Sequence, residues 1–215
     1  MGNTINKVDP FGDNSGVALW QFDGNANDTG GNYNGTWHGT EQYDTGKWEQ
    51  ASKFNGSSYI DFNSYVTCNA ISLWCKLSNN NNHQVFFREK SISTDINLCF
   101  YKNSMRFYIY DGSNVYKNNT LINYGNWYHI IIVRNSSTSY TFYLNGNDDG
   151  NITTSNSLGD SLYLRLSGVK ENENYKINGL IDQVRIFNRA LTSKEVSYLH
   201  NEFMPSKSFA RSNIF

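Results

Sequence analysis

The sequence predicts an all-β fold, in which two antiparallel sheets form a sandwich with one short C-terminal helix. Three observations indicate this fold. Residues 17–188 form a dense series of short segments with alternating apolar and polar residues, separated by Gly, Asn, Ser and Asp turns. Only the segment at about 192–203 has helical periodicity. With 15% aromatic and 17% charged residues, the composition suits an apolar sheet core beneath a polar, largely uncharged surface.

The expected elements form a single domain between two terminal segments. Residues 1–15 are polar and turn-rich, so we expect an N-terminal arm before a domain at 16–203. Within the domain, 121–134 and 140–144 are expected to pair, because a short Asn/Ser/Thr segment joins two apolar runs. Sandwiches of this length commonly form one domain.

The segment 179–196 carries the strongest local signal. It begins as a strand and continues into Thr192 and Glu195, which fit a capping box, where each side chain accepts from the other residue's amide. We therefore expect a helix at about 192–203. Its apolar face is expected to contain Val196, Leu199 and Phe203.

The tail at 204–215 contains Pro205, which stops this helix. The tail is basic and then apolar, and a loose terminus gains nothing by exposing large apolar residues. Two alternatives stay open. The tail folds back over its own sandwich, or tail and arm dock on a neighbouring subunit, where burial offsets the ordering entropy.

Charge and cysteine content argue against several classes of protein. The formal net charge of -1 does not suit a broad nucleic-acid-binding surface. No segment has the length and apolar character of a membrane span, and the N-terminus lacks the layout of a signal peptide. The cysteines Cys68, Cys75 and Cys99 are odd in number and lack paired spacing, so we expect buried, reduced thiols rather than disulfides or zinc ligands.

Several strands place aromatic and basic residues opposite their leucines. In 105–110 and 161–166, apolar residues alternate with Tyr and Arg. The candidate ligand-binding residues on this second face are Arg106, Tyr108, Tyr110, Tyr163 and Arg165. Two interpretations stay open: an ordinary amphipathic surface, or a binding face, since flat rings stack on sugar C–H surfaces and Arg binds hydroxyls or carboxylates.

The loop at 23–32 is rich in oxygen ligands. Its spacing is superficially that of an EF-hand, but position six is Asp28 rather than Gly, and position twelve is Asn34 rather than Glu. An Asx-rich turn bonded to its own backbone is the alternative. Asp182 lies inside the apolar closing strand and needs a partner, because a buried carboxylate is costly alone.

An ordered series of motifs resembles the laminin-G-like, concanavalin A-like jelly-roll family. The motifs are 17–25 (VALWQFDGN), 46–60 (GKWEQASKFNGSSYI), 71–76 (ISLWCK), 126–129 (NWYH), 142–146 (FYLNG) and 179–196 (GLIDQVRIFNRALTSKEV). Trp48 stands where the family pattern usually has a small or aromatic residue. The resemblance implies a jelly-roll sandwich, a fold that serves lectins, adhesins, enzyme accessory domains and virion proteins.

The resemblance also implies a metal and argues against catalysis. Related sandwiches often hold a structural calcium where the acidic loop meets the closing strand, and its ligands here would be Asp23, Asn25, Asp28 and Asp182. Related glucanases carry catalytic carboxylates as Glu-x-Asp-x-x-Glu, which this chain lacks. Gly-x-Ser-x-Gly, P-loop and Rossmann motifs are also missing from the sequence.

We therefore predict a non-enzymatic, lectin-like binding or structural module. The lead-in at 4–20 is similar to that of phage-encoded particle proteins, which favours a virion protein (capsid decoration or tail) that contacts glycans or neighbouring subunits. Whether it forms a homo-oligomer stays open. The alternatives are a secreted cell-surface carbohydrate-binding or adhesin module, and a glycoside hydrolase whose motif was lost or moved. The expected location is a virion or the extracellular space.

Overall fold

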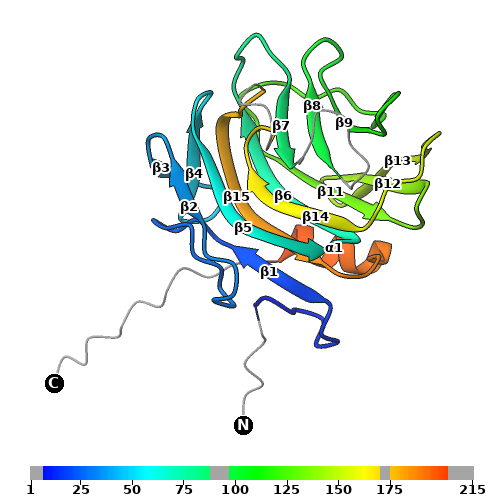
Figure 1. Ribbon diagram of the computed structural model, residues 1–215, viewed down its shortest axis with the longest axis horizontal. Coiled ribbons are helices and arrows are strands. Elements are labelled where there is room, and N and C mark those ends of the chain that lie inside the picture. Colours follow the sequence, from blue (N-terminus) through cyan, green and yellow to red (C-terminus); the bar gives the residue numbers. More distant parts are fainter. Residues whose placement is uncertain (1–6, 88–96, 170–174, 203–215) are drawn as a thin grey trace, which may run out of the picture.

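Two layers of antiparallel strands make up the molecule (Figure 1). A computed structural model describes residues 7–87, 97–169 and 175–202, in which it has fifteen strands and one helix. The all-β prediction is therefore confirmed. The first layer, the large sheet, contains β13 (Asn147–Thr153), β12 (Ser139–Leu144), β11 (Tyr128–Arg134), β6 (Ala70–Leu77), β15 (Asn178–Phe187), β4 (Gln50–Asn55) and β3 (Tyr43–Thr45), with β1 (Gly16–Trp20) also paired to β15.

The second layer is split into two smaller sheets. One contains β10 (Val115–Lys117), β9 (Arg106–Tyr110), β8 (Leu98–Tyr101) and β7 (Gln84–Phe87), and the other β14 (Ser161–Leu166), β5 (Tyr59–Thr67) and β2 (Thr36–His38). The amides of Ser167 and Gly168, just after β14, donate to the carbonyls of Phe86 and Val85 in β7 (3.0 and 2.9 Å). These bonds join the two sheets into one continuous layer.

The core lies between the layers, and strand alternation fills it. In β9, Phe107 and Ile109 point inward, and in β14 the three leucines do so. All of these side chains are fully or almost fully buried. The Tyr and Arg residues between them therefore face away from the large sheet, as the two-residue period of a strand requires. The expected pairing of 121–134 with 140–144 is found in the strands β11 and β12.

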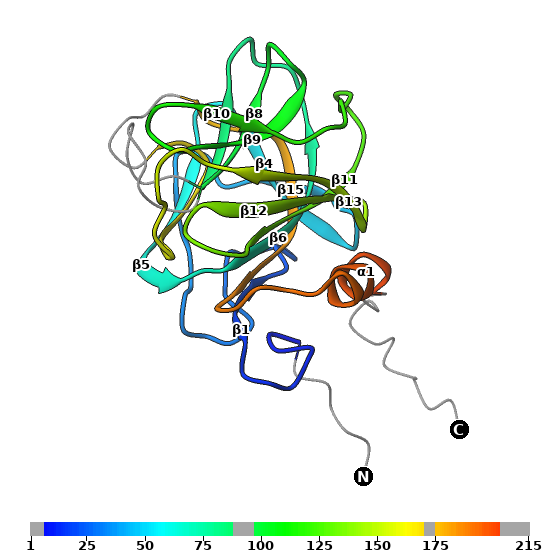
Figure 2. The ribbon, with the colours of Figure 1, turned by 90° about the vertical axis from the view of Figure 1, so that its right-hand side faces the viewer.

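The helix α1 (Ser193–Asn201) covers part of the outer surface of the large sheet (Figure 2). Its capping box is present, since Glu195 N donates to Thr192 Oγ1 (3.3 Å) and Thr192 N to Glu195 Oε2 (2.8 Å). Val196 and Leu199 pack against Ile131 and other apolar residues of the sheet. The predicted helix is thus confirmed, although its residue at 203 and the tail at 204–215 lie outside the described residues.

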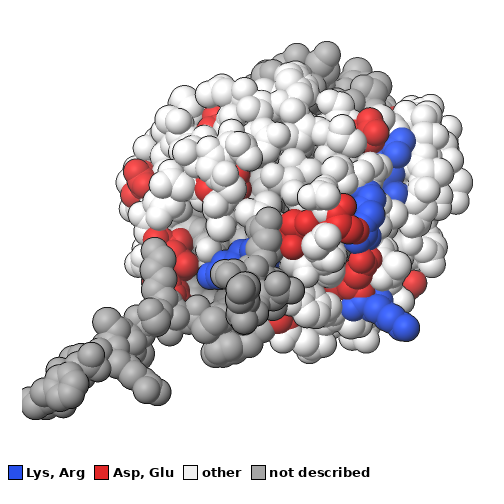
Figure 3. All heavy atoms as spheres, turned by 90° about the horizontal axis from the view of Figure 1, so that it is seen from below, with Lys and Arg blue, Asp and Glu red and all other residues white. Residues whose placement is uncertain are grey.

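The described part of the expected arm, residues 7–15, packs against the domain. The Phe11 ring lies 5.6 Å from the Phe187 ring and 5.9 Å from the Tyr198 ring. Arg189 donates to both Asp13 and Glu195, which ties this segment to the start of α1. Seen from below, acidic and basic side chains lie side by side rather than in separate fields (Figure 3), as the near-zero net charge suggests.

The three cysteines are reduced and buried, as predicted. Burial raises the pKa of the Cys68 and Cys75 thiols, so both remain protonated at neutral pH. In the described part of the chain, no helix is both long enough and apolar enough to cross a membrane.

Candidate functional site

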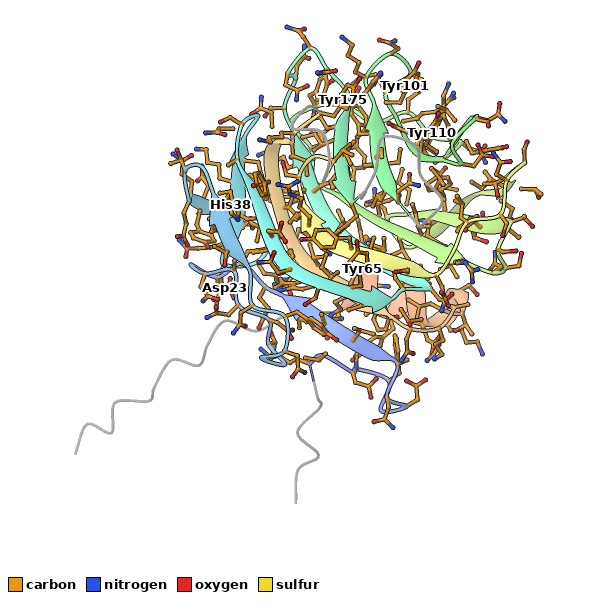
Figure 4. The ribbon with its side chains drawn as sticks, viewed as in Figure 1. Asp23, His38, Tyr65, Tyr101, Tyr110 and Tyr175 are labelled. Carbon is orange, nitrogen blue, oxygen red and sulfur yellow. The ribbon has the colours of Figure 1, made fainter. Side chains whose placement is uncertain are left out.

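The outer surface of the second layer carries most of the polar aromatic side chains that the sequence singled out. We call it the aromatic face. Its rings belong to His38, Tyr59, Tyr65, Tyr101, Tyr108, Tyr110 and Tyr163, with His83 and Tyr175 packed beside them. Figure 4 shows Tyr65 over the β5–β14 half, and Tyr101, Tyr110 and Tyr175 over the β7–β10 half. Asp23 lies apart from these rings, toward the lower edge.

All five predicted ligand-binding residues lie on this face, but in two groups. Arg106, Tyr108 and Tyr110 come from β9, whereas Tyr163 and Arg165 come from β14. The strands β7 and β8 lie between, so three strand spacings, about 14 Å, separate the groups. Tyr108, Tyr163 and Arg165 are at most 7% exposed, so they support the surface more than they offer contact area.

In the β5–β14 half, a hydrogen-bonded cluster holds Arg165. Tyr163 donates its hydroxyl to Asp61 Oδ1 (2.8 Å), and Arg165 Nε lies 3.8 Å from Asp61 Oδ2. The Arg165 guanidinium lies over the Tyr59 ring, 3.6 Å from its centroid. Tyr65 rests its ring against the edge of Tyr163 (5.0 Å) and is 53% exposed, which makes it the most accessible tyrosine of this half.

The β7–β10 half is organised around Tyr101. The His83 ring stacks on it (4.4 Å between centroids), and the Tyr108 ring meets its edge (5.6 Å). Lys117 Nζ lies 4.8 Å from the Tyr101 centroid. Burial, and to a smaller extent the charge of Lys102, lowers the pKa of His83, so this ring is neutral at neutral pH.

Sequence reasoning missed several residues of the aromatic face. Tyr59, Asp61 and Tyr65 share it by strand alternation, since Ile60, Phe62 and Val66 face the core. The bulge at the left-handed residue Asn63 (φ 51°) adds two residues to β5 relative to β14 and so keeps this alternation, which means that the pattern could have identified Tyr65. Tyr101 had a readable signal, since Leu98 and Phe100 of the same strand are core residues and the tyrosine alternates with them. Lys117 lies in a strand of three residues, too short to show a period.

The acidic loop is held mainly by Asp28. Its Oδ1 accepts from the amides of Leu19 (3.0 Å) and Gly30 (3.1 Å), and its Oδ2 from those of Asn32 (3.0 Å) and Tyr33 (3.3 Å). Four amide donors occupy both carboxylate oxygens, so Asp28 organises the loop in the manner of an Asx turn. Asn25 likewise bonds within the loop, through the amide of Asn27 (2.9 Å).

Asp182 has a different environment. Its Oδ2 accepts from the amides of Lys47 (2.8 Å) and Trp48 (3.1 Å), whereas its Oδ1 is buried with no hydrogen-bond partner among the described residues. Burial, chiefly, and the nearby charge of Asp23 raise the pKa of Asp182 to about 7. An unsatisfied buried oxygen is costly and indicates a missing partner.

Three chain segments meet near Asp182, and each contains a non-glycine residue with positive φ. These are Phe22 (58°), Glu49 (44°) and Gln183 (48°). Such conformations are uncommon outside glycine and cluster at functional sites. Of the residues that the sequence proposed as metal ligands, the segments bring together Asp23 and Asp182, since Asp23 accepts from the amide of Gln50 (3.2 Å), close to the amides that hold Asp182.

These residues fit a hard cation by donor type. Among the described residues, no three His, Cys, Asp or Glu side chains gather to hold one metal ion. Two carboxylates, one with an unsatisfied buried oxygen, nevertheless supply the charge that calcium prefers, and amide or carbonyl oxygens commonly complete its shell. Asp28, with both oxygens occupied, belongs to the loop framework.

The outer surface of the large sheet also holds rings, but they are covered. Trp74 stacks with His129 (4.8 Å) and His200 of α1 (5.3 Å), and Trp48 meets its edge (5.2 Å). Ser72 Oγ lies 2.9 Å from His129 Nε2. Burial lowers the pKa of His129 to about 3, helped by the nearby cationic groups, so this ring is a neutral core residue and not an acid–base group at neutral pH.

Comparisons with known proteins identify the family. The laminin G model described as the concanavalin A-like lectin/glucanases superfamily matches residues 54–197, more than half of the chain. No relative among the curated proteins matches the sequence.

Among solved structures, domain 4 of AbnA, a GH43 extracellular arabinanase from Geobacillus stearothermophilus, in complex with arabinotriose, is similar at 23% identity and a TM-score of 0.66, over 85% of this chain and 97% of that one. Botulinum neurotoxin type C, whose cell entry depends on interaction with two ganglioside molecules, is similar at 16% identity and a TM-score of 0.60, over 86% of this chain and 50% of that one. The binding domain of botulinum neurotoxin serotype D is similar at 17% identity and a TM-score of 0.59, over 86% of this chain and 51% of that one.

The chain thus spans about half the length of these toxin chains. At such low identities the likeness concerns the fold. Together with the family model and the two-layer architecture, it confirms the jelly-roll prediction. The chain belongs to the concanavalin A-like lectin/glucanase superfamily.

Proposed function

We propose that the protein is a non-enzymatic carbohydrate-binding module that binds glycans on its aromatic face. The observation that carries the proposal is the exposure of this face. Tyr65 is 53% exposed on a layer whose outer surface no described strand or helix covers, whereas α1 covers part of the opposite surface. An exposed tyrosine with a flat ring and a polar hydroxyl suits a ligand with C–H surfaces and hydroxyl groups.

The cluster beneath Tyr65 supports this proposal. The Tyr163 ring packs against the Tyr65 ring, and the Tyr163 hydroxyl donates to Asp61. A ring fixed by a buried neighbour loses little conformational entropy when a ligand binds. The bound arabinotriose of the arabinanase domain also supports a saccharide ligand, by analogy of fold alone.

The test compares two tyrosines of similar exposure on opposite surfaces. Wild type, Tyr65→Ala and Tyr198→Ala are applied to a glycan array, and hits are titrated by calorimetry, with arabinotriose included. Tyr198 is the matched control, because it is 43% exposed on α1. We expect Tyr65→Ala to weaken glycan binding about tenfold or more and Tyr198→Ala to leave it unchanged, since a stacked aromatic contributes on the order of 1 kcal/mol or more. Equal affinities of the two variants would place the site elsewhere.

The non-enzymatic part of the proposal has its own test. Any polysaccharide that binds is incubated with the protein, and new reducing ends are measured. We expect none, because the sequence lacks the paired-carboxylate motif of related glucanases. Steady release of reducing ends would instead favour the glycoside hydrolase alternative.

As the setting we propose a phage virion, where the module contacts glycans or neighbouring subunits. The similarity of residues 4–20 to the lead-in of phage particle proteins supports this setting. Mass spectrometry of purified particles tests it directly. Recovery from the cell surface or medium, and not from particles, would favour the secreted adhesin alternative.

We further propose a structural calcium held by Asp23 and Asp182. The buried Asp182 Oδ1, which lacks a hydrogen-bond partner among the described residues, supports it. When bound, the ion would supply the charge that compensates two neighbouring carboxylates. Because an ion that binds only the folded state stabilises it, chelation should lower the melting temperature of wild type and leave Asp182→Asn unaffected.

Asp28→Asn is the control for this experiment. It disturbs a carboxylate of the same loop that four amides already occupy, so it should lower stability but keep the response to chelator. A wild-type melting curve that is the same with and without calcium, in metal-free buffer, would overturn the calcium proposal.

A further inference from the structure

Two stacks of the same composition lie on the aromatic face, one in each half. Each contains a histidine, a tyrosine and a cation, in that order. The first contains His38, Tyr59 and Arg165, and the second His83, Tyr101 and Lys117. They come from different sheets of the second layer, and no sequence repeat relates them.

In the first stack, both sides of the Tyr59 ring are occupied. The His38 ring is 4.5 Å away and nearly parallel (7°). A ring at that distance fills one side, so the Arg165 guanidinium, 3.6 Å from the centroid, lies over the other. Lys176 Nζ adds a second cation at 4.9 Å and donates to the carbonyl of Ser57 (2.9 Å).

The second stack repeats this arrangement with a single cation. The His83 ring lies 4.4 Å from Tyr101 at 14°, and Lys117 Nζ lies 4.8 Å from the same ring. Lys117 pairs with Tyr108 across the β9–β10 ladder, so it points to the same face. Lys102, which follows β8, lies close enough to lower the pKa of His83.

The stacks change what the aromatic face offers to a ligand. Tyr59 and Tyr101 have no free side on which a sugar ring could stack. Their electron-rich faces instead hold cations near the surface, where Lys117 and Lys176 remain partly exposed. Asp61, a carboxylate among these cations, already accepts from Tyr163 and lies 3.8 Å from Arg165. The described part of the face therefore carries more basic than acidic groups, in a chain whose formal net charge is -1.

We infer that the aromatic face selects polysaccharides with anionic groups, carboxylate or sulfate, with Lys117 and Lys176 as the contacting cations. The inference rests on the proposed carbohydrate binding and names its ligand class. The stacks lie three strand spacings apart, about 14 Å, so the ligand is a chain of several sugars that reaches both. Tyr65 stacks on a sugar ring, and the two lysines bind the anionic groups and so favour charged over neutral polysaccharides.

Paired polymers that differ only in charge test this inference. Polygalacturonate is compared with its carboxyl-reduced, neutral form, and dextran sulfate with dextran, by affinity electrophoresis and calorimetry. We expect the charged member of at least one pair to bind about tenfold or more tightly, and its affinity to fall from about 50 mM to about 500 mM NaCl because salt screens exposed charges. The pair that responds identifies carboxylate or sulfate as the anion.

A double variant locates the effect. Lys117→Gln with Lys176→Gln should weaken binding of the charged polymer about fivefold to tenfold, the size expected for two partly exposed ion pairs. The control, Lys53→Gln with Lys194→Gln, makes the same change in net charge on β4 and α1, away from the face, and should bind like wild type.

The outcomes separate this inference from the proposed function. Equal binding of the charged and neutral polymers, with Tyr65 still required, would overturn the anionic selection and leave carbohydrate binding in place. Equal losses of affinity in the Lys117→Gln, Lys176→Gln variant and in its control would also overturn it, because the affinity would then depend on net charge and not on this face. Failure of every glycan on the array would contradict the proposed function itself.

Discussion

The two outer surfaces of the sandwich use the same kinds of side chain in opposite ways. On the large sheet, Trp74 and His129 stack with each other, and His200 of α1 stacks on Trp74. The helix therefore covers these rings. On the second layer, His38 and Tyr59 stack with the same geometry, but no described element lies over them. Stacked rings therefore do not identify a binding surface by themselves. Exposure to solvent is what distinguishes the two surfaces, and the proposed binding site rests on it.

Burial also separates the titration of the two surfaces. His129, under cover, has its pKa lowered to about 3, so protonating it at mildly acidic pH would cost folding free energy. Asp182 lies opposite Trp74 in the β6–β15 ladder, on the same covered side, and its pKa is raised to about 7. The covered surface is thus where stability depends on pH, and the aromatic face is where binding should depend on charge.

The largest expected effect comes from the core that supports the aromatic face. Phe107 is fully buried between the layers, directly between Arg106 and Tyr108 in β9. We expect Phe107→Ala to destabilise the fold by about 3–5 kcal/mol, through lost burial and the cavity left behind. Urea unfolding followed by fluorescence measures it. A loss below about 1 kcal/mol would contradict the assignment of this side chain to the core.

The next effect tests the covered side through pH. Without calcium, the raised pKa of Asp182 means that the folded state holds a proton more tightly than the unfolded chain. Its contribution to stability is fully present below about pH 4 and is lost as pH rises through about 7, by up to about 4 kcal/mol. Asp182→Asn should lack this loss, and calcium should abolish it in wild type by favouring the carboxylate.

The comparison with Asp182→Asn is needed because the titration of His129 changes the stability of the fold in the opposite direction with pH. Its contribution to stability is lost as pH falls below 6.5, toward its lowered pKa. We therefore compare the free energies of unfolding of wild type and Asp182→Asn, measured with urea at several pH values. The contribution of His129 is the same in both proteins and cancels in their difference. A difference that stays constant from pH 4 to 8 would show that Asp182 titrates normally.

A smaller effect concerns the helix that covers the large sheet. Thr192 caps α1, and its hydroxyl accepts from the amide of Glu195. Thr192→Ala should lower the free energy of unfolding by about 1 kcal/mol, the usual value of such a cap. Thr192→Ser keeps the hydroxyl, so its free energy of unfolding should fall much less. Binding to glycans should not change in either variant, since the cap lies on the opposite side from the aromatic face.

The smallest expected effect on stability is that of Tyr65→Ala. The side chain is 53% exposed, so its removal should change the free energy of unfolding by about 0.5 kcal/mol or less. The same variant is expected to show the largest loss of glycan binding. A marked loss of stability would mean that Tyr65 supports the fold, and its binding data would then need to be reinterpreted.

The sequence predicted the architecture better than the site. Alternation in β9 and β14 assigned the correct faces, and the capping box located α1, because both are local patterns. The exposed ring of Tyr65 was missed, although it alternates with the core residues Ile60, Phe62 and Val66 and so was readable from the sequence. Buried positions such as Tyr108 were chosen instead, because alternation reports direction and not accessibility.

The two aspartates of the expected metal site illustrate a second limit. Asp28 and Asp182 are the same residue type, and each lies in a motif that resembles the family. Only the fold shows that four local amides occupy the oxygens of Asp28, while Asp182 receives two amides from a segment some 130 residues earlier. The other oxygen of Asp182 has no hydrogen-bond partner within the described ranges. Hydrogen bonds between distant segments leave no local pattern to read.

The position of β15 has a consequence for how the protein is made. This strand is the last of the described strands, yet it lies inside the large sheet and pairs with β1, β4 and β6. During synthesis, β1, β4 and β6 leave the ribosome long before their common partner and wait with unpaired edges. Such long-range pairing folds slowly and exposes edges that promote aggregation. Closure of the large sheet must therefore wait until β15 has been synthesised, and truncated products that end before Asn178 should depend on chaperones.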